Sequence, residues 1–140
     1  MAKQYKSLGY LNTGIFSAII LFSHGFDFDE ITGVLKDTKA KEWRIGIEND
    51  RELIDGGNCF ALSREITNSK TGKVVSLYYI ILKQDFDFTD YSYCKLAHEV
   101  LHICQFMLPD LLDRNREFEC EAYLHTHIMS QCLKQIRGEH

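Results

Sequence analysis

Two histidines and one glutamate stand close together in the segment HEVLH, residues 98–102. His98 and His102 are four residues apart, so on an α-helix their side chains lie about 40° apart, on one face. Zn²⁺ binds imidazole nitrogens at about 2.0–2.1 Å, and Glu99 can reach a water molecule on that metal without being a ligand. The motif therefore predicts two metal ligands and a general base on one helix.

A zinc site needs a third ligand, and the segment REFECEAYLHTH, residues 116–127, follows after a connection short enough for a second helix to fold back antiparallel. Its candidate ligands are Glu119, Cys120, Glu121, His125 and His127. The expected core stripe of this helix is Phe118, Ala122, Met129, Leu133 and Ile136. Glu119 lies about 80° to one side of that stripe and Glu121 about 70° to the other, so helical geometry leaves both glutamates as candidates.

HExxH followed by a glutamate in an E-x-x-A pattern on a second helix resembles the gluzincin zinc metallopeptidases. Residues 119–123 read ECEAY, which matches E-x-E-A-x. The resemblance implies His98 and His102 as ligands, Glu99 as the base and Glu119 as the third ligand. It covers about residues 90–130, and the small size is most similar to the minimal gluzincins of phages and mobile elements. The family often has an Asp where this chain has a tyrosine at position 123.

Two further side chains of the second helix are candidate catalytic residues. The phenol of Tyr123 is a candidate donor to a developing oxyanion. His125 lies on the expected stripe with Ala122 and Met129, which leaves three roles open: a hydrogen-bonded core histidine, a residue that orients a ligand, or a transition-state donor. In the resembled family an edge strand beside the active helix binds the substrate backbone, which implies such a role for VVSLYYIILK or its hairpin partner.

The elements that position these residues form an α+β pattern, with strands first and two long helices last. A helical pattern runs from about Asp90 to Met107, where Pro109 is expected to end it, and another from about Glu117 to Ile136. Leu96, Val100, Ile103 and Met107 form the apolar stripe of the first of these helices, opposite His98 and His102. The earlier segments are predicted as a buried strand at 14–23, a short helix at 29–39 capped by Asp27 or Asp29, a strand EWRIGIE at 42–48 before a charged turn NDRE, and a hairpin formed by NCFALSREIT and VVSLYYIILK.

These elements predict a small, mostly antiparallel sheet of three to five strands packed against two long C-terminal helices that carry the metal site. We expect a single domain over residues 1–140, because no repeat or linker appears and Pro109 is the only proline. Within it, residues 1–85 are the strand-rich half and residues 90–137 contain the two active-site helices.

Composition excludes several other functions. The net charge is −4 and the 16 Lys and Arg residues are scattered, which argues against nucleic-acid binding. The five cysteines are odd in number and form no CxxC pair, which favours reduced thiols and a cytoplasmic location. The apolar stretch from Leu8 to Phe22 is too short to span a bilayer, so no membrane association is expected.

The sequence predicts a zinc-dependent hydrolase with one Zn²⁺ per chain that cleaves a peptide or protein substrate through a metal-activated water. The alternative is a non-catalytic binding or regulatory domain in which the same zinc staples the two helices. Structural zinc sites are usually closed by four protein ligands, so a contact from Cys104, Cys120 or His125 would favour that alternative. A third reading is a chance motif in a metal-free interaction domain.

Overall fold

The structure is a computed structural model. It describes residues 6–13, 16–57, 59–82, 88–111 and 118–138. Within these ranges, side chains are not described at residues 16–17, 38, 108–111 and 118–120.

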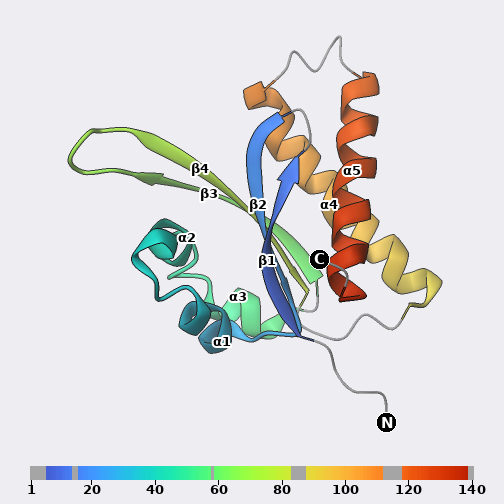
Figure 1. Ribbon diagram of the computed structural model, residues 1–140, viewed down its shortest axis with the longest axis horizontal. Helices are drawn as coiled ribbons and strands as arrows, with labels where there is room; N and C mark the ends of the chain where they lie inside the picture. Colours follow the sequence, from blue (N-terminus) through green and yellow to red (C-terminus); the bar gives the residue numbers. More distant parts are fainter. Residues whose placement is uncertain (1–5, 14–15, 58, 83–87, 112–117, 139–140) are drawn as a thin grey trace.

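Along the described residues a pair of strands is followed by short helices, a second pair of strands and two long helices, and the class is α+β as predicted (Figure 1). The elements are β1 (Ser7–Thr13), β2 (Phe16–His24), α1 (Phe28–Val34), the 3₁₀ helix η1 (Thr38–Ala40), α2 (Lys41–Gly46), α3 (Arg51–Gly56), β3 (Cys59–Thr67), β4 (Val74–Leu82), α4 (Asp90–Leu111) and α5 (Phe118–Ile136). Helices α4 and α5 contain 22 and 19 residues and are the longest elements.

The four strands form one mixed sheet in the order β1-β2-β4-β3. The β1/β2 and β3/β4 pairs are antiparallel, and β3/β4 is the predicted hairpin. The central β2/β4 pair is parallel, which the expectation of a mostly antiparallel sheet did not include. The chain between β2 and β4 contains α1 to α3 and β3, and such a long crossover is what a parallel pairing requires. Strand β3 therefore lies at one edge of this sheet and β1 at the other.

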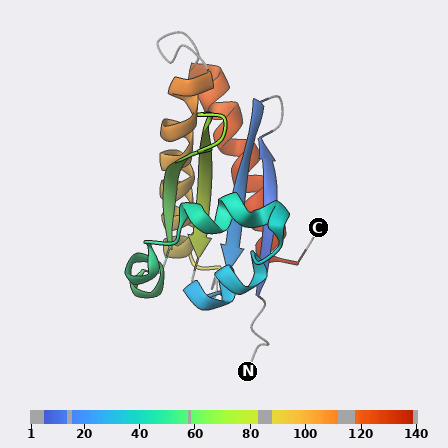
Figure 2. The ribbon, with the colours of Figure 1, turned by 90° about the vertical axis from the view of Figure 1, so that its left-hand side faces the viewer.

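Helices cover both faces of the sheet (Figures 1 and 2). Because side chains alternate along a strand, Ile20 and Phe22 of β2 pack with α4 and α5, whereas Leu21 packs with α1 to α3. Helix α4 packs on β3 and β4, and α5 packs on β1 and β2. The second helical layer was not predicted, and with it both faces are buried over residues 20–24 of β2 and 77–82 of β4.

Two segments of the strand-rich half differ from the sequence prediction. EWRIGIE was predicted as a strand, but residues 42–46 lie in α2 and residues 47–48 in the turn after it, and the predicted turn NDRE leads into α3. Trp43 and Ile47 are four residues apart, so a helical turn directs both towards the sheet, where the Trp43 ring contacts Tyr79 at a centroid distance of 5.3 Å. The buried strand predicted at 14–23 corresponds to β2, and the start of the same apolar stretch forms a further strand, β1.

The predicted core face of α4 is confirmed, because Leu96, Val100, Ile103 and Met107 are all buried. The helix does not end before Pro109, however, and continues to Leu111. Proline lacks a backbone N–H, so Pro109 cannot bond to the carbonyl oxygen four residues earlier, and only two residues of the helix follow it.

The predicted core stripe of α5 is confirmed at Ile136 and in part at Met129 and Leu133, which pack against the core, whereas the side chain of Phe118 lies outside the described residues. Ala122 is exposed, and Met129 and Leu133 are only half-buried. The buried stripe consists of Leu124, Ile128, Cys132 and Ile136. The physical reason is that α5 packs on the sheet and on α4 at once, so its half-buried flank carries apolar residues that resemble a core stripe on a helical wheel.

Four cysteines have described side chains, and all four are free thiols: Cys59, Cys94, Cys104 and Cys132. Cys94 is exposed and the other three are buried. None of the described helices has the length and apolar character needed to cross a membrane.

Candidate functional site

His98 and His102 lie together on the solvent side of α4. Their Nε2 atoms are 3.0 Å apart, and their rings meet edge to face with centroids 4.5 Å apart. His98 is exposed and His102 is half-buried, whereas Val100 between them is fully buried. The predicted shared face of the two imidazoles, opposite the core stripe, is therefore confirmed.

The separation of the two Nε2 atoms is suited to a shared metal ion. Two imidazole nitrogens about 2.0–2.1 Å from one tetrahedral ion stand about 3.3 Å apart. The observed 3.0 Å is shorter by a few tenths of an ångström, which small rotations of two surface side chains can supply. The spacing of the two Nε2 atoms is therefore suited to two ligands of one divalent metal ion.

The ring of His102 is held by two neighbours on the same helix. Its Nδ1 atom is 3.2 Å from Oε1 of Gln105, one turn further on. The ring also stacks on Phe106, with centroids 6.2 Å apart and planes inclined by 17°. Neither neighbour was singled out from the sequence, although their i+3 and i+4 spacing from His102 was a usable signal.

Glu99 turns towards the sheet edge. Its Oε2 accepts a hydrogen bond of 2.7 Å from the backbone N–H of Ala61 in β3. The side chain is half-buried and projects about 60° from His102 on the helical wheel. Burial and then the nearby charge of Glu99 raise the pKa of the Cys59 thiol to about 12, so this thiol is protonated at neutral pH. The edge strand therefore positions the predicted base.

The sheet topology decides which strand is open for pairing beside α4. Strand β4 lies between β2 and β3, so the edge role falls to β3, its hairpin partner. The β3/β4 register is continuous from Cys59 to Thr67. Since the Ala61 N–H points away from β4 to Glu99, alternation directs the backbone groups of Ser63 and Glu65 away from β4 as well.

Of the two candidate glutamates on α5, only Glu121 has a described side chain. Glu119 lies in the first turn of α5, but its side chain is outside the described residues, as is that of Cys120. Glu121 is half-buried. Among the residues that the structure describes, no three His, Cys, Asp or Glu side chains form a group that could hold a metal ion, so Glu121 does not complete such a group with His98 and His102.

His125 ties α5 to α4 immediately before the histidine pair. Its Nε2–H donates to the carbonyl oxygen of Ala97 at 3.1 Å, and its ring is half-buried. Glu121 is four residues earlier, so it shares this face of α5, whereas Glu119 projects about 120° from His125. Of the roles left open for His125, the hydrogen bond to the α4 backbone is the one the structure displays.

Tyr123 lies on a different side of α5 from His125. On the wheel the two side chains project about 160° apart. The Tyr123 ring stacks on His127 with centroids 5.9 Å apart, and His127 Nε2 is 2.9 Å from Asn12 Oδ1 in β1. The structure therefore groups Tyr123 with β1 rather than with the histidine pair.

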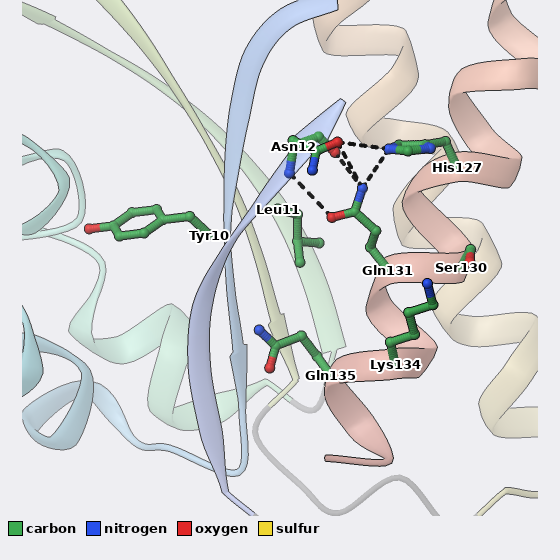
Figure 3. Close-up of a pocket in the computed structure, with 8 residues that line it drawn as sticks. All are labelled: Tyr10, Leu11, Asn12, His127, Ser130, Gln131, Lys134 and Gln135. Carbon is green, nitrogen blue, oxygen red and sulfur yellow. Dashed lines mark hydrogen bonds between the residues drawn. The ribbon is translucent and has the colours of Figure 1, made fainter. Parts of the chain in front are cut away.

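A pocket of about 570 Å³ lies between β1 and α5 (Figure 3). Gln131 bridges its wall, because its side-chain amide donates to the Asn12 carbonyl oxygen at 2.8 Å and accepts from the Asn12 backbone N–H at 3.3 Å. Its lining contains no residue of HEVLH and consists of Tyr10, Leu11, Asn12, His127, Ser130, Gln131, Lys134 and Gln135. This pocket is thus separate from the histidine pair.

Comparison of the chain with protein-family models, curated proteins and solved structures finds no match. The resemblance to gluzincins accordingly rests on the residues HEVLH and ECEAY alone.

Proposed function

We propose that this protein is a zinc-dependent hydrolase, a gluzincin-like metallopeptidase that cleaves peptide bonds in a peptide or protein. The observation that carries the proposal is the pair of Nε2 atoms of His98 and His102, 3.0 Å apart on the solvent side of α4, with Glu99 on the same helix at the sheet edge. Helices α4 and α5 carry the site, and one Zn²⁺ per chain is held by His98, His102 and a glutamate of α5. Bound there, zinc supplies Lewis-acid chemistry: it lowers the pKa of a water and polarises a carbonyl group.

Two glutamates of α5 compete for the third position. The E-x-x-A pattern favours Glu119. Glu121 is supported by its position on the face of α5 that His125 presents to α4. Because α4 and α5 are antiparallel, the turn of α5 before His125 lies level with the turn of α4 that follows Ala97, which begins at His98 and ends just before His102.

Glu99 acts as the general base. Its Oε2 stays on the Ala61 N–H while Oε1 takes a proton from the attacking water and passes it to the leaving amine. Anchoring one oxygen to a backbone group restricts the side chain to few rotamers, which reduces the entropy lost when water and substrate are aligned.

The substrate binds as an additional strand along the open edge of β3. The Ser63 N–H and the Glu65 backbone groups point away from β4 and can pair with an extended peptide, whereas the Ser63 carbonyl oxygen already accepts a hydrogen bond of 2.9 Å from Arg64 Nη1. The expected substrate is therefore an unfolded or extended segment rather than a helix.

Metal content tests the proposal. The protein is purified without added metal and its zinc is measured by elemental analysis, beside His98→Ala, Glu119→Ala and Glu121→Ala. We expect about one zinc per chain, lost in His98→Ala and in one glutamate variant only. His127→Ala is the matched control, because this histidine contacts β1 and should leave zinc bound.

Hydrolysis separates the catalytic proposal from a structural zinc site. Cleavage of unfolded protein or a peptide library by the zinc-loaded chain supports a peptidase. Zinc held by four protein ligands, detected by X-ray absorption as a sphere without water, would support the helix-stapling domain instead. Failure of the wild type to bind zinc even after reconstitution overturns both.

A further inference from the structure

We infer that Gln105 is a positioning residue for the proposed zinc site: it sets the tautomer of His102 so that Nε2 offers a lone pair. The inference rests on the proposed function. The hydrogen-bonding capacities of the Gln105 amide and the His102 ring support it. An amide oxygen only accepts, so the contact of 3.2 Å between Gln105 Oε1 and His102 Nδ1 requires the proton on Nδ1.

The proton on Nδ1 determines the other nitrogen of the ring. In a neutral imidazole one nitrogen donates and the other accepts, so His102 Nε2 carries a lone pair. That lone pair faces Nε2 of His98 at 3.0 Å, which must then be the donor. Two histidines on successive turns of α4 are thus expected to hold opposite tautomers in the metal-free protein.

The arrangement prepares one ligand in advance. Metal-binding histidines generally donate the proton of their other nitrogen to an oxygen, which fixes the tautomer and the ring plane. Gln105 supplies that oxygen from the next turn, and the stack on Phe106 restrains the plane of the His102 ring. To bind a metal through Nε2, His98 must first move its proton from Nε2 to Nδ1, whereas His102 already has the required tautomer.

The reverse orientation of the Gln105 amide gives a different outcome. If its nitrogen faced His102, it would donate to Nδ1, and the proton of His102 would move to Nε2. Gln105 would then oppose metal binding, so the position of one proton decides the inference.

Tautomers are read from the imidazole nitrogen chemical shifts of ¹⁵N-labelled, metal-free protein at a pH where both rings are neutral. We expect Nδ1–H at His102 and Nε2–H at His98. Gln105→Met, which has a similar length but no acceptor, should populate Nε2–H at His102. Gln105→Glu keeps an acceptor oxygen and should restore Nδ1–H. Gln131→Met, a glutamine variant on α5, is the control and should leave both patterns unchanged.

Zinc affinity gives the second readout. In competition with a chelator, Gln105→Met should bind zinc about 10–100-fold more weakly than wild type, and Gln105→Glu at least as tightly. Nε2–H at His102 in the wild type, or equal zinc affinity in Gln105→Met, would overturn the inference while leaving the zinc site intact. If the wild type binds no zinc, the proposed function fails. Loss of Nδ1–H at His102 in Gln105→Met would then still show that Gln105 sets the tautomer of His102.

Discussion

Replacement of Glu99 by glutamine separates the chemical role of this side chain from its structural one. The carboxamide has the same size and can still accept the hydrogen bond of 2.7 Å from the Ala61 N–H. Net contributions of hydrogen bonds are about 1.5–3 kcal/mol with a charged partner and about 0.5–1.5 kcal/mol between neutral groups. We therefore expect Glu99→Gln to lower the free energy of unfolding by only about 1 kcal/mol.

The expected loss of activity is larger. A positioned general base contributes about 10²–10⁴-fold to the rate, which corresponds to about 3–5 kcal/mol of activation free energy. Glu99→Gln removes the base but neither histidine, so zinc content should be unchanged while peptide hydrolysis falls by at least 10²-fold.

Three measurements on the same preparation test this reasoning: zinc content, denaturant unfolding and cleavage of a quenched fluorescent peptide. Glu52→Gln is the matched control, because this exposed glutamate of α3 undergoes the same charge change on the face of the sheet opposite to α4. Wild-type turnover by pure Glu99→Gln would refute the role of Glu99 as base. Loss of zinc in Glu99→Gln would show that the carboxylate supports metal binding instead.

Gly46→Ala should lower the free energy of unfolding by about 1–3 kcal/mol in a denaturant titration, because a Cβ there would overlap the Tyr79 hydroxyl. Gly33→Ala, which meets open space in α1, should raise the free energy of unfolding by about 0.5–1 kcal/mol, and equal effects of the two substitutions would contradict the close packing of Gly46 on Tyr79. Burial and then a nearby carboxylate charge raise the pKa of the Cys59 thiol from 9.0 to about 12. The protonated thiol therefore contributes its full stabilisation below pH 9, and the free energy of unfolding falls by about 1.4 kcal/mol per pH unit as the pH rises from 9 to about 12. Cys59→Ala should flatten the alkaline decline measured by urea unfolding, and an unchanged slope would argue against burial of the thiol. Gln131→Ala removes the side chain that covers the edge of β1, so self-association in sedimentation experiments should increase, whereas an unchanged distribution of species would show that α5 covers this edge without it.

Local patterns determined the helix that carries the histidine pair and its orientation. The spacing of Leu96, Val100, Ile103 and Met107 sets the buried face of α4, and residues two positions away from that stripe necessarily face outward. His98 and His102 thus come together through one turn of a helix, which requires no distant contact. The β3/β4 hairpin is local in the same sense, because a short Gly-containing turn joins its strands.

The elements near Trp43 show where local patterns failed. The segment around Trp43 alternates like a strand but also has apolar residues four apart, and packing against Tyr79 selects the helix. Similarly, the wheel of α5 has two apolar flanks, and only the simultaneous contact with α4 and the sheet decides that Leu124 and Ile128 are buried while Met129 is half-buried.

Helical periodicity places residues four apart on one face, so the two imidazoles and the carboxylate of HEVLH could be assigned to one helix without any knowledge of the fold. Three features could not be inferred in this way: the contact of Glu99 with the backbone of Ala61, the position of β3 rather than β4 at the edge of the sheet, and the contact of His125 with Ala97 that holds α5 against α4. Each of these features depends on strand order and on helix docking between segments about 20 to 40 residues apart. The free energy of burying both faces of the sheet selects that arrangement, and no local sequence pattern encodes it.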